Sequence, residues 1–500
     1  MSKDMRNALL GLVGLVLAGG VLLSVTSAPP EPSHADPETP ARGSKAAAAS
    51  DKDKDKAIKL VWRRDIGDRT IAPEGAPNLL VLQACALRKD ALTMYGGLDG
   101  LTPNIDALAS RGAQFEDALS TSAWTKPAVA SMFTGRHALE LGIIEPGNEV
   151  STRQMQAQER TLAEALVDDG WFTLAVNTSP AVTRQNSAVW QGFDHIRDSH
   201  PTGWKGENRM GAKSAANMAI RMLRQRPVDR PFYAHVVLSS SHKPVRVPPA
   251  ESQVWTEQGT PNGPYMATVF RTDEAVGSLV AFLEEEGLLD NTVVVFVSDH
   301  GEGLNRPPHH GPAHGRYLVP SVVEVPWVVA GPGVKSGQTV HGLASLVDFA
   351  PTMLGLLGVQ TPLGEDLAGR DYSAPLQGQG SATDRDVAWT DTWYHNVNRA
   401  AGWTRDMQCQ RDFGTVMAED APDEPFEDGC YHRDKDPDHT TAMANQGLMD
   451  RLVQWRGDRP VVNHPKKKAV GPRNEGGPGA VFPKKGGKKP ASKAAKAAAE

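Results

Sequence analysis

Apolar segments of strand length recur along this chain and alternate with segments of helical periodicity. The apolar segments lie at residues 78–85, 171–177, 232–241, 292–299 and 326–331. Because each is apolar without alternation, it is typical of a strand buried on both faces, as in a parallel sheet covered by helices. The segments at 103–112, 161–170 and 272–287 are amphipathic, and each ends in glycine, as helices often do. This alternation predicts a doubly wound α/β fold, with a central, mostly parallel sheet flanked by helices.

Polar residues stand where these expected strands end. Ligands of doubly wound proteins bind at the carboxyl ends of the parallel strands. The residues that close or follow the apolar segments are Cys85, Asn177, Ser240 to His242, Asp299 and His300. We therefore expect the functional site at this edge of the sheet.

The two ends of the chain differ in composition from the body between them. Residues 1–28 hold Lys3 and Arg6 ahead of an uncharged apolar run, which predicts a cleaved signal peptide or an uncleaved N-terminal membrane anchor. Residues 29–75 begin rich in Pro, Ala, Ser, Lys and Asp and are interpreted as a flexible linker. Residues 461–500 are low in complexity and rich in Lys, which predicts a disordered basic tail.

Charge is distributed unevenly along the 500 residues, whose formal net charge is −6. Residues 465–500 sum to +8, so the rest of the chain sums to −14. An acidic body is a poor surface for neutralising phosphates, so no nucleic-acid partner is expected. With 40% hydrophobic residues and three cysteines, the chain is neither a disulfide-knotted module nor a multi-span membrane protein.

A carboxylate and an imidazole are adjacent at Asp299 and His300, directly after the most apolar strand segment. More histidines follow at His309, His310 and His314, within a loop rich in Gly and Pro. This set of oxygen and nitrogen donors predicts a site for a divalent metal. A surface loop with hydrogen-bonded histidines is the alternative interpretation.

Thr125 stands two places before Pro127, which suits the first turn of a helix. A hydroxyl there lies near free backbone N–H groups that favour an anion. Thr125 is therefore either a helix cap or a nucleophile, and a nucleophilic alcohol requires a metal or a base to activate it.

Several further segments stand out along the chain. They are NLLVLQACALRKDALTMYGG at 78–97, TPNIDALASRGAQFEDALST at 102–121, WTKPAVASMFTGRH at 124–137, QGFDH at 191–195, SSSHKP at 239–244, GLLDNTVVVFVSDHGEG at 287–303, HGRY at 314–317 and VPWVVAGPGV with SLVDFAPTMLGLLG at 325–358. In this order and spacing they resemble the sulfatase family of the alkaline phosphatase-like superfamily. The resemblance implies a sulfatase-like catalytic domain at 76–378 and a small C-terminal subdomain at 379–460.

The resemblance also implies roles for individual residues. Thr125 stands at the family's nucleophile position, and Asp299 and His300 match its metal ligands. His242 and His314 match histidines that contact the anion or the leaving group. Further substrate contacts are expected from residues next to these positions, namely Lys126 and Arg316, together with His242.

Two departures from the family pattern bear on the chemistry. The residues Thr125-Lys126-Pro127 lack the convertible Cys or Ser and the Arg of Cys/Ser-x-Pro-x-Arg, so no formylglycine is expected. Threonine here resembles the phosphoglycerol and phosphoethanolamine transferases of the superfamily. Cys85 replaces the first metal-binding carboxylate, and it is either a ligand or a buried thiol that binds nothing. The family implies one divalent ion, Ca²⁺, whereas a thiolate suits Zn²⁺ or another softer metal, with Mn²⁺ as a further alternative.

Cys409 and Cys430 are the other two cysteines, 21 positions apart in a chain that is expected to be exported. A disulfide between them is the expectation in an oxidising compartment, and two separate thiols are the alternative.

Three functions follow as hypotheses. The first is an exported hydrolase of sulfate or phosphate esters that uses a metal-assisted Thr125 or a metal-bound water, and acts on a small or polymeric anionic substrate. The second is a catalytically degenerate, sulfatase-like binding protein, and the third a phosphoglycerol- or phosphoethanolamine-type transferase acting on envelope lipids or glycans. We expect a periplasmic location or an anchor on the outer side of the inner membrane, with membrane association through the N-terminal segment.

Overall fold

A computed structural model describes most of the expected domain. The described residues are 69–143, 155–184, 186–199, 210–260, 262–304, 314–380, 385–394, 397–414 and 427–457. The expected signal or anchor at 1–28, the basic tail at 461–500, most of the linker, and His309 and His310 lie outside these residues.

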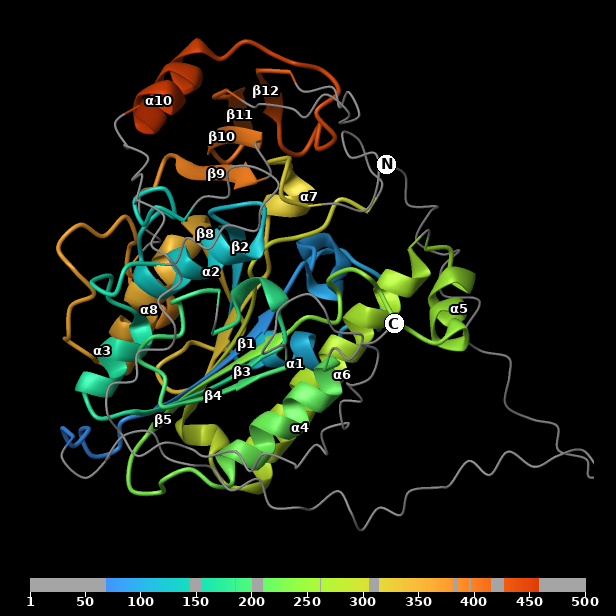
Figure 1. The fold of residues 1–500 in the computed structure, drawn as a ribbon. Coiled ribbons are helices and arrows are strands. Elements are labelled where there is room, and N and C mark those ends of the chain that lie inside the picture. Colours follow the sequence, from blue (N-terminus) through green and yellow to red (C-terminus); the bar gives the residue numbers. More distant parts are fainter. Residues whose placement is uncertain are drawn as a thin grey trace, which may run out of the picture. The chain divides into compact units, whose positions relative to one another are not determined.

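An eight-stranded sheet forms the centre of the molecule, in the order β4-β3-β5-β1-β6-β7-β2-β8 (Figure 1). The strands are β1 (Asn78–Ala84), β2 (Ala113–Leu119), β3 (Phe172–Asn177), β4 (His195–Asp198), β5 (Phe232–Leu238), β6 (Thr292–Ser298), β7 (Trp327–Ala330) and β8 (Gln338–Ser345). Only β7 runs antiparallel to both of its neighbours. The predicted central, mostly parallel sheet is therefore confirmed, with β2, β4 and β8 as strands that the apolar pattern did not indicate.

Helices cover both faces of this sheet (Figure 1). They are α1 (Pro103–Arg111), α2 (Thr125–Thr134), α3 (Leu162–Asp168), α4 (Ala212–Leu223), α5 (Pro249–Glu257), α6 (Gly263–Glu285), α7 (Pro320–Val323), α8 (Phe349–Leu357) and α9 (Ser373–Leu376). On one face α6 contacts both α1 and α4, and on the other α2, α3 and α8 contact one another. The apolar strands are thereby buried on both sides, as their uniform hydrophobicity predicts.

Helix α6 begins earlier than its amphipathic pattern indicates, at Gly263 rather than Thr272. Pro264 occupies the first turn, where its fixed φ favours a helix. Tyr265 and Val269 are buried and extend the apolar face towards the N-terminus. The expected C-terminal end is close to the observed one, because Gly287 follows the helix with a φ of +66°.

A second, four-stranded antiparallel sheet lies within the expected C-terminal subdomain (Figure 1). Its order is β12-β11-β10-β9, with β9 (Ala388–Tyr394), β10 (Val397–Trp403), β11 (Met407–Asp412) and β12 (Gly429–His432). Helix α10 (Gln446–Gly457) contacts β10 and β11.

Arg433 attaches this small sheet to the large one. It is buried, and its Nη1 donates to Asp117 Oδ2 at 2.8 Å, while its Nε donates to Glu324 Oε1 at 3.2 Å. A backbone bond from Asp391 N to Thr121 O, 3.0 Å long, also joins β9 to the segment after β2. The segment before α2 is thus supported by the C-terminal sheet.

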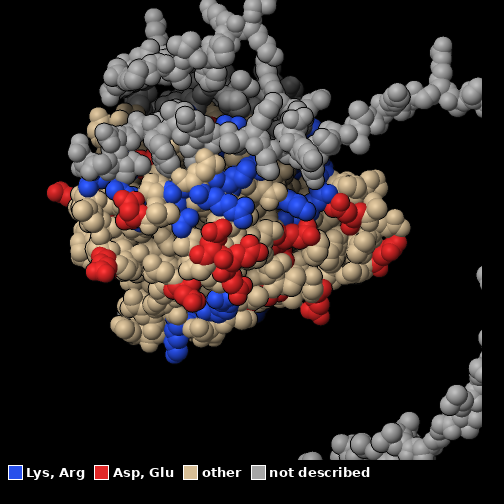
Figure 2. Space-filling model, turned by 90° about the horizontal axis from the view of Figure 1, so that it is seen from below, with Lys and Arg blue, Asp and Glu red and all other residues tan. Residues whose placement is uncertain are grey.

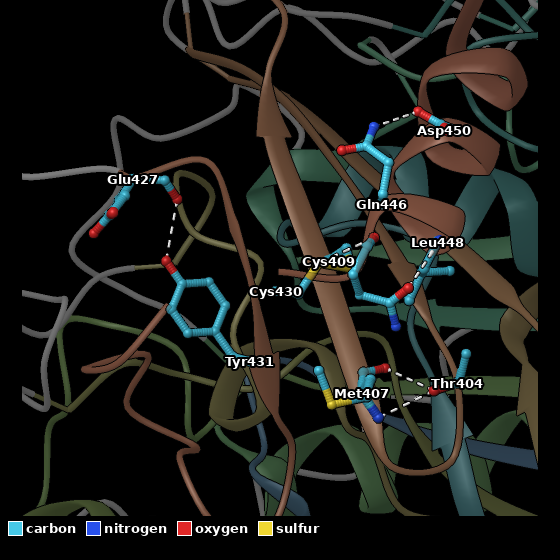
Figure 3. Close-up of a disulfide and its surroundings, with 10 residues drawn as sticks. Thr404, Met407, Cys409, Glu427, Cys430, Tyr431, Gln446, Leu448 and Asp450 are labelled. Atoms are coloured by element: carbon cyan, nitrogen blue, oxygen red, sulfur yellow. Dashed lines mark hydrogen bonds between the residues drawn. A yellow bond between two sulfur atoms is a disulfide. The ribbon is translucent and has the colours of Figure 1, made fainter. Parts of the chain in front are cut away.

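The two expected disulfide partners face each other across β11 and β12 (Figure 3). The sulfur atoms of Cys409 and Cys430 are 1.97 Å apart and bonded. The neighbouring turn between β10 and β11 is closed by Thr404, whose N donates to Met407 O at 2.8 Å. Its Oγ1 accepts from Met407 N at 3.0 Å (Figure 3).

Residues 69–75 fall within the expected linker, yet they contact the domain. Arg69 Nη1 donates to Asp194 Oδ2 at 2.8 Å, and Ala72 packs against the main core. Gly170 permits this approach: a Cβ there would lie 2.5 Å from Ala72 N. Contacts of the domain therefore begin before residue 76.

The surface of the described residues carries both charges. On the face seen from below, a band of Lys and Arg lies beside a group of Asp and Glu (Figure 2). Among the described helices, none combines the length and apolar character that a bilayer span needs.

Candidate active site at the carboxyl edge of the central sheet

The parallel register of β1 and β6 brings Cys85 and Asp299 together. Ala84 and Ser298 are partners at the strand ends, and Asp299 N donates to Ala84 O at 3.1 Å. On the other side, Cys85 N donates to Leu238 O of β5 at 3.1 Å. Residues far apart in sequence are thus adjacent because three parallel strands end at the same edge.

Thr125 completes this cluster from a different element. It is the first residue of α2 and is 2% exposed. Its Oγ1 lies 3.1 Å from His300 Nε2 and 3.4 Å from Cys85 Sγ. The helix N-terminus therefore directs the hydroxyl at the residues that end β1 and β6.

Cys85, Asp299 and His300 form a group of metal-ligating type. One ligand atom from each lies within 4.8 Å of the others, and all three side chains are buried. This set of one sulfur, one oxygen and one nitrogen matches the donors of zinc sites. It does not fit Ca²⁺, which takes six to eight oxygen ligands.

Hydrogen bonds orient His300 for this role. Its Nδ1 lies 2.8 Å from Gly301 O, a pure acceptor, so Nδ1 carries the proton and donates it. Nε2 is then left with a lone pair that faces Thr125. Burial lowers the pKa of His300 and outweighs the charge of Asp299, which by itself would raise that pKa. The imidazole is therefore neutral at physiological pH.

Asp299 is fixed by backbone donors. Its Oδ1 accepts from His300 N at 2.8 Å and from Ala86 N at 3.2 Å. Ala86 has a φ of +60°, a left-handed conformation that costs a non-glycine residue about 1–2 kcal/mol. The backbone after β1 is strained at the point where its N–H reaches this carboxylate.

The thiol of Cys85 is protonated in the absence of a cation. Burial and the nearby charge of Asp299 raise its pKa well above the usual value. Since metals bind the thiolate, a metal at this position would have to displace the proton.

A second group of side chains lies beside the first. The His314 ring is centred 4.4 Å from that of His300 and 4.9 Å from that of His242. His314 Nδ1 donates to Glu302 Oε2 at 3.1 Å. Although burial opposes it, the interaction with His314 lowers the pKa of Glu302 to about 2. The ionised Glu302 therefore anchors the His314 ring.

The two remaining residues expected to contact the substrate, Lys126 and Arg316, differ in how deeply they are buried. Lys126 follows Thr125 in α2 and is 4% exposed, whereas Arg316 is half-buried two positions after His314. Sequence reasoning did not select Lys243, whose pKa is lowered by burial and raised in part by Glu302. Its place next to His242 was the available signal.

The other buried partner that sequence reasoning missed is Gln83, whose Nε2 lies 3.4 Å from Asp299 Oδ2. An amide within an apolar strand, two residues before Cys85, was the signal that could have found it.

A separate cavity of about 460 Å³ lies between α1, α6 and the start of β6. Its lining includes Asn104, Arg111, Glu284 and Thr292. None of the candidate site residues lines it, so it does not belong to this site.

Comparison with known proteins relates the whole domain to one family. The sulfatase family profile matches residues 77–359. The ulvan-active sulfatase of Formosa agariphila is 24% identical over 352 residues, which cover 62% of this chain and 67% of that protein. The N-acetylgalactosamine-6-sulfatase of Canis lupus familiaris is 24% identical over 359 residues, which cover 62% and 68%.

Solved structures agree on the fold. The phosphonate monoester hydrolase of Agrobacterium radiobacter superposes with a TM-score of 0.60 at 20% identity, covering 77% of this chain and 96% of that one. At this identity the similarity concerns the fold alone, and the chemistry has to be argued from the residues of this chain.

Proposed function

The chain belongs to the sulfatase family of sulfate-ester hydrolases, and we propose that it hydrolyses sulfate esters with Thr125 as the nucleophile. The observation that carries the proposal is the position of the Thr125 hydroxyl, 3.1 Å from His300 Nε2 and 3.4 Å from Cys85 Sγ. No other hydroxyl is proposed for this role.

We propose Cys85, Asp299, His300 and Thr125 as the residues that hold one divalent ion, with Zn²⁺ favoured over Ca²⁺ by the donor set. When bound, such an ion supplies a positive charge that lowers the pKa of an alcohol and neutralises an anionic ester.

In the first step Thr125 Oγ1 forms a bond to the sulfur, and the bond between sulfur and the ester oxygen breaks. The hydroxyl proton of Thr125 passes to solvent. His242 or His314 gives a proton to the leaving oxygen, which departs as an alcohol. Glu302 holds the His314 ring in place through Nδ1.

In the second step a water oxygen attacks the sulfur, and the bond to Thr125 Oγ1 breaks. The water loses one proton, Thr125 regains one, and sulfate leaves. Lys126, Lys243 and Arg316 are the cationic side chains next to these residues in sequence, and we assign them to binding the anion.

The substrate is proposed to be a sulfated carbohydrate, small or polymeric. One relative is named for its activity on ulvan, and another for removing a 6-sulfate from N-acetylgalactosamine. The cationic residues next to the site residues in sequence suit such an anionic ester.

Turnover of an aryl sulfate and of sulfated sugars by Thr125→Ala and Thr125→Ser tests the nucleophile. We expect Thr125→Ala to lose at least ~10³-fold in kcat, and Thr125→Ser, which keeps a hydroxyl, to retain measurable turnover. Unchanged turnover by Thr125→Ala, with the fold intact, would exclude this nucleophile and would favour direct attack by water.

Two further candidates are each favoured by one residue. Cys85 in place of a carboxylate favours a binding protein without catalysis, which would bind sulfated sugars but turn none over. Thr125 favours a phosphoglycerol- or phosphoethanolamine-type transferase. Transfer of the group to a lipid or glycan acceptor in preference to water would identify that activity.

We also propose that the protein is exported, either released into the periplasm or anchored at the outer side of the inner membrane. The bonded pair Cys409 and Cys430 supports this proposal, because disulfides persist in oxidising compartments. Cell fractionation of the full-length protein tests it, and recovery from the cytoplasm with both thiols reduced would contradict it.

A further inference from the structure

A row of four hydrogen-bonded, buried polar side chains lies in the interior of the central sheet and ends at Asp299. Tyr233 Oη lies 2.9 Å from His235 Nδ1, and His235 Nε2 lies 2.8 Å from Gln83 Oε1. Gln83 Nε2 in turn donates to Asp299 Oδ2 at 3.4 Å. Each of these four side chains has no exposed surface. Buried polar groups next to a large apolar core require an explanation.

The strand register explains how the four groups meet. Strand β1 is paired in parallel with β5, with Val81 opposite His235. Residues two apart on a strand share one face of the sheet, so Gln83 lies on the same face of β1 as Val81, the residue opposite His235. Strand β1 ends one residue after Gln83, and Cys85, a proposed metal ligand, follows it directly.

Aromatic rings enclose His235 and fix its protonation. The rings of Phe133, Trp190 and Phe193 are centred 4.9, 5.9 and 6.4 Å from it. Burial lowers the pKa of His235 to about 3, and burial raises the pKa of Tyr233 well above its usual value. The imidazole is therefore neutral with one N–H, and the phenol keeps its proton.

Only one direction of hydrogen bonding gives each of these four side chains a donor facing an acceptor. If Tyr233 donates to Nδ1, the proton of His235 is on Nε2 and is donated to Gln83 Oε1, which turns the amide NH₂ towards Asp299. In the opposite direction Nε2 would accept from the amide NH₂, and Gln83 Oε1 would face a carboxylate oxygen, two acceptors in contact. The phenol thus determines which end of Gln83 reaches Asp299.

We propose that Gln83 and His235, directed by Tyr233, are positioning residues that hold the Asp299 carboxylate in the orientation that binds the metal. The inference rests on the proposed function, because it concerns the same site. It is a property of residues of this chain that do not themselves contact the substrate or the ion.

Three hydrogen-bond donors occupy most of the lone pairs of the Asp299 carboxylate. Oδ1 accepts from Ala86 N and His300 N, and Oδ2 accepts from Gln83 Nε2. A carboxylate offers about four lone-pair positions, so three donors leave one for a cation. Asp299 would then have one lone-pair position with which to hold a cation, and the three donors fix the orientation of its side chain.

Zn²⁺ affinity of the full-length protein, measured by competition with a chelator, tests the proposal. Gln83→Leu is expected to weaken Zn²⁺ binding by about 10- to 100-fold, as losses of groups that orient a ligand usually do. Tyr372→Phe is the matched control, because it removes an equally buried hydroxyl whose hydrogen bond goes to Leu343 O at 2.7 Å. Its affinity should equal that of the wild type.

A pair of substitutions separates positioning from packing. His235→Gln keeps one donor and one acceptor in line, whereas His235→Leu keeps the volume but neither group. We expect His235→Gln to retain tighter Zn²⁺ binding than His235→Leu, at equal thermal stability of the metal-free proteins. Tyr233→Phe provides a milder variant if Gln83→Leu does not fold, and it should weaken binding by up to about 10-fold.

The same measurements distinguish a wrong positioning role from a wrong metal site. Wild-type affinity in Gln83→Leu and Tyr233→Phe, or equal affinity of the two His235 variants, would overturn the positioning role alone. A wild-type protein that binds no Zn²⁺ would overturn both the metal site and this inference.

Discussion

The two sheets of this protein are held together in different ways. The inner strands of the eight-stranded sheet are buried on both faces, and their parallel register brings Cys85 and Asp299 together at one edge. The four-stranded sheet is tied by a disulfide between β11 and β12 and by the buried ion pairs of Arg433. None of its described residues is among the proposed ligands or nucleophile. The large sheet therefore carries the residues that are proposed for the chemistry, and the small sheet supports the segment ahead of α2.

The largest effect is expected from the edge of the large sheet. Asp299→Asn replaces a charged proposed ligand. We expect kcat/KM to fall on the order of 10³-fold, which corresponds to an activation free energy higher by about 4 kcal/mol. Asp450→Asn, an exposed acidic residue of α10, is the control and should leave turnover unchanged. Steady-state kinetics on one sulfate ester measures both. Equal activity of Asp299→Asn and the wild type would show that Asp299 holds no ion that turnover requires.

The next effect concerns the choice of metal. Cys85→Asp restores the oxygen donor that the family pattern implies at the end of β1. We expect Zn²⁺ affinity to fall and Ca²⁺ or Mn²⁺ affinity to rise, because a carboxylate suits harder cations than a thiolate does. Titration of metal-free protein with each ion measures the change. An unchanged order of affinities would show that Cys85 contributes no ligand.

A third effect is the pH dependence of stability that His235 confers. Its folded pKa of about 3 lies below the unfolded value of 6.5, so the stabilisation is present above pH 6.5 and is lost as pH falls towards 3. Between pH 7.5 and pH 4 the wild type should lose about 3 kcal/mol more than His235→Gln, which does not titrate. Urea unfolding of both metal-free proteins at the two pH values measures the difference. Parallel losses would mean that His235 is already neutral when unfolded, or solvated when folded.

Changes in the small sheet are expected to affect Zn²⁺ binding at the site least. Removing the disulfide with Cys409→Ala and Cys430→Ala should cost about 3 kcal/mol of stability, from the loop that it closes. Zn²⁺ affinity, measured at a temperature where the variant stays folded, should be unaffected. A matching loss of affinity would show that the two sheets are less independent than the contacts indicate.

The sequence predicted the edge of the sheet better than its interior. Uniformly apolar runs mark where β1 and β6 end, so Cys85 and Asp299 could be placed at one edge from the pattern alone. The direction of β7 could not, because Trp327–Ala330 is apolar throughout and carries no sign of its antiparallel pairing. The contact between Gln83 and His235 depends on β1 lying next to β5, which a pattern of separate strands does not specify.

Among the site residues, the sequence identified the proposed ligands but not what orients them. Asp299, His300 and Thr125 carry recognisable chemistry in recognisable places. Glu302 and Gln83 act through neighbours that are known only once the loops and strands are packed. A buried amide has no local signature beyond its polarity within an apolar strand.

X-ray absorption at the zinc edge, on full-length protein loaded with one equivalent of Zn²⁺, shows directly whether Cys85 binds the ion. We expect one sulfur ligand at about 2.3 Å beside nitrogen and oxygen ligands at about 2.0–2.2 Å, with the sulfur absent in Cys85→Asp. A zinc ion surrounded only by nitrogen and oxygen, or protein that retains no zinc, would contradict the proposed site of Cys85, Thr125, Asp299 and His300.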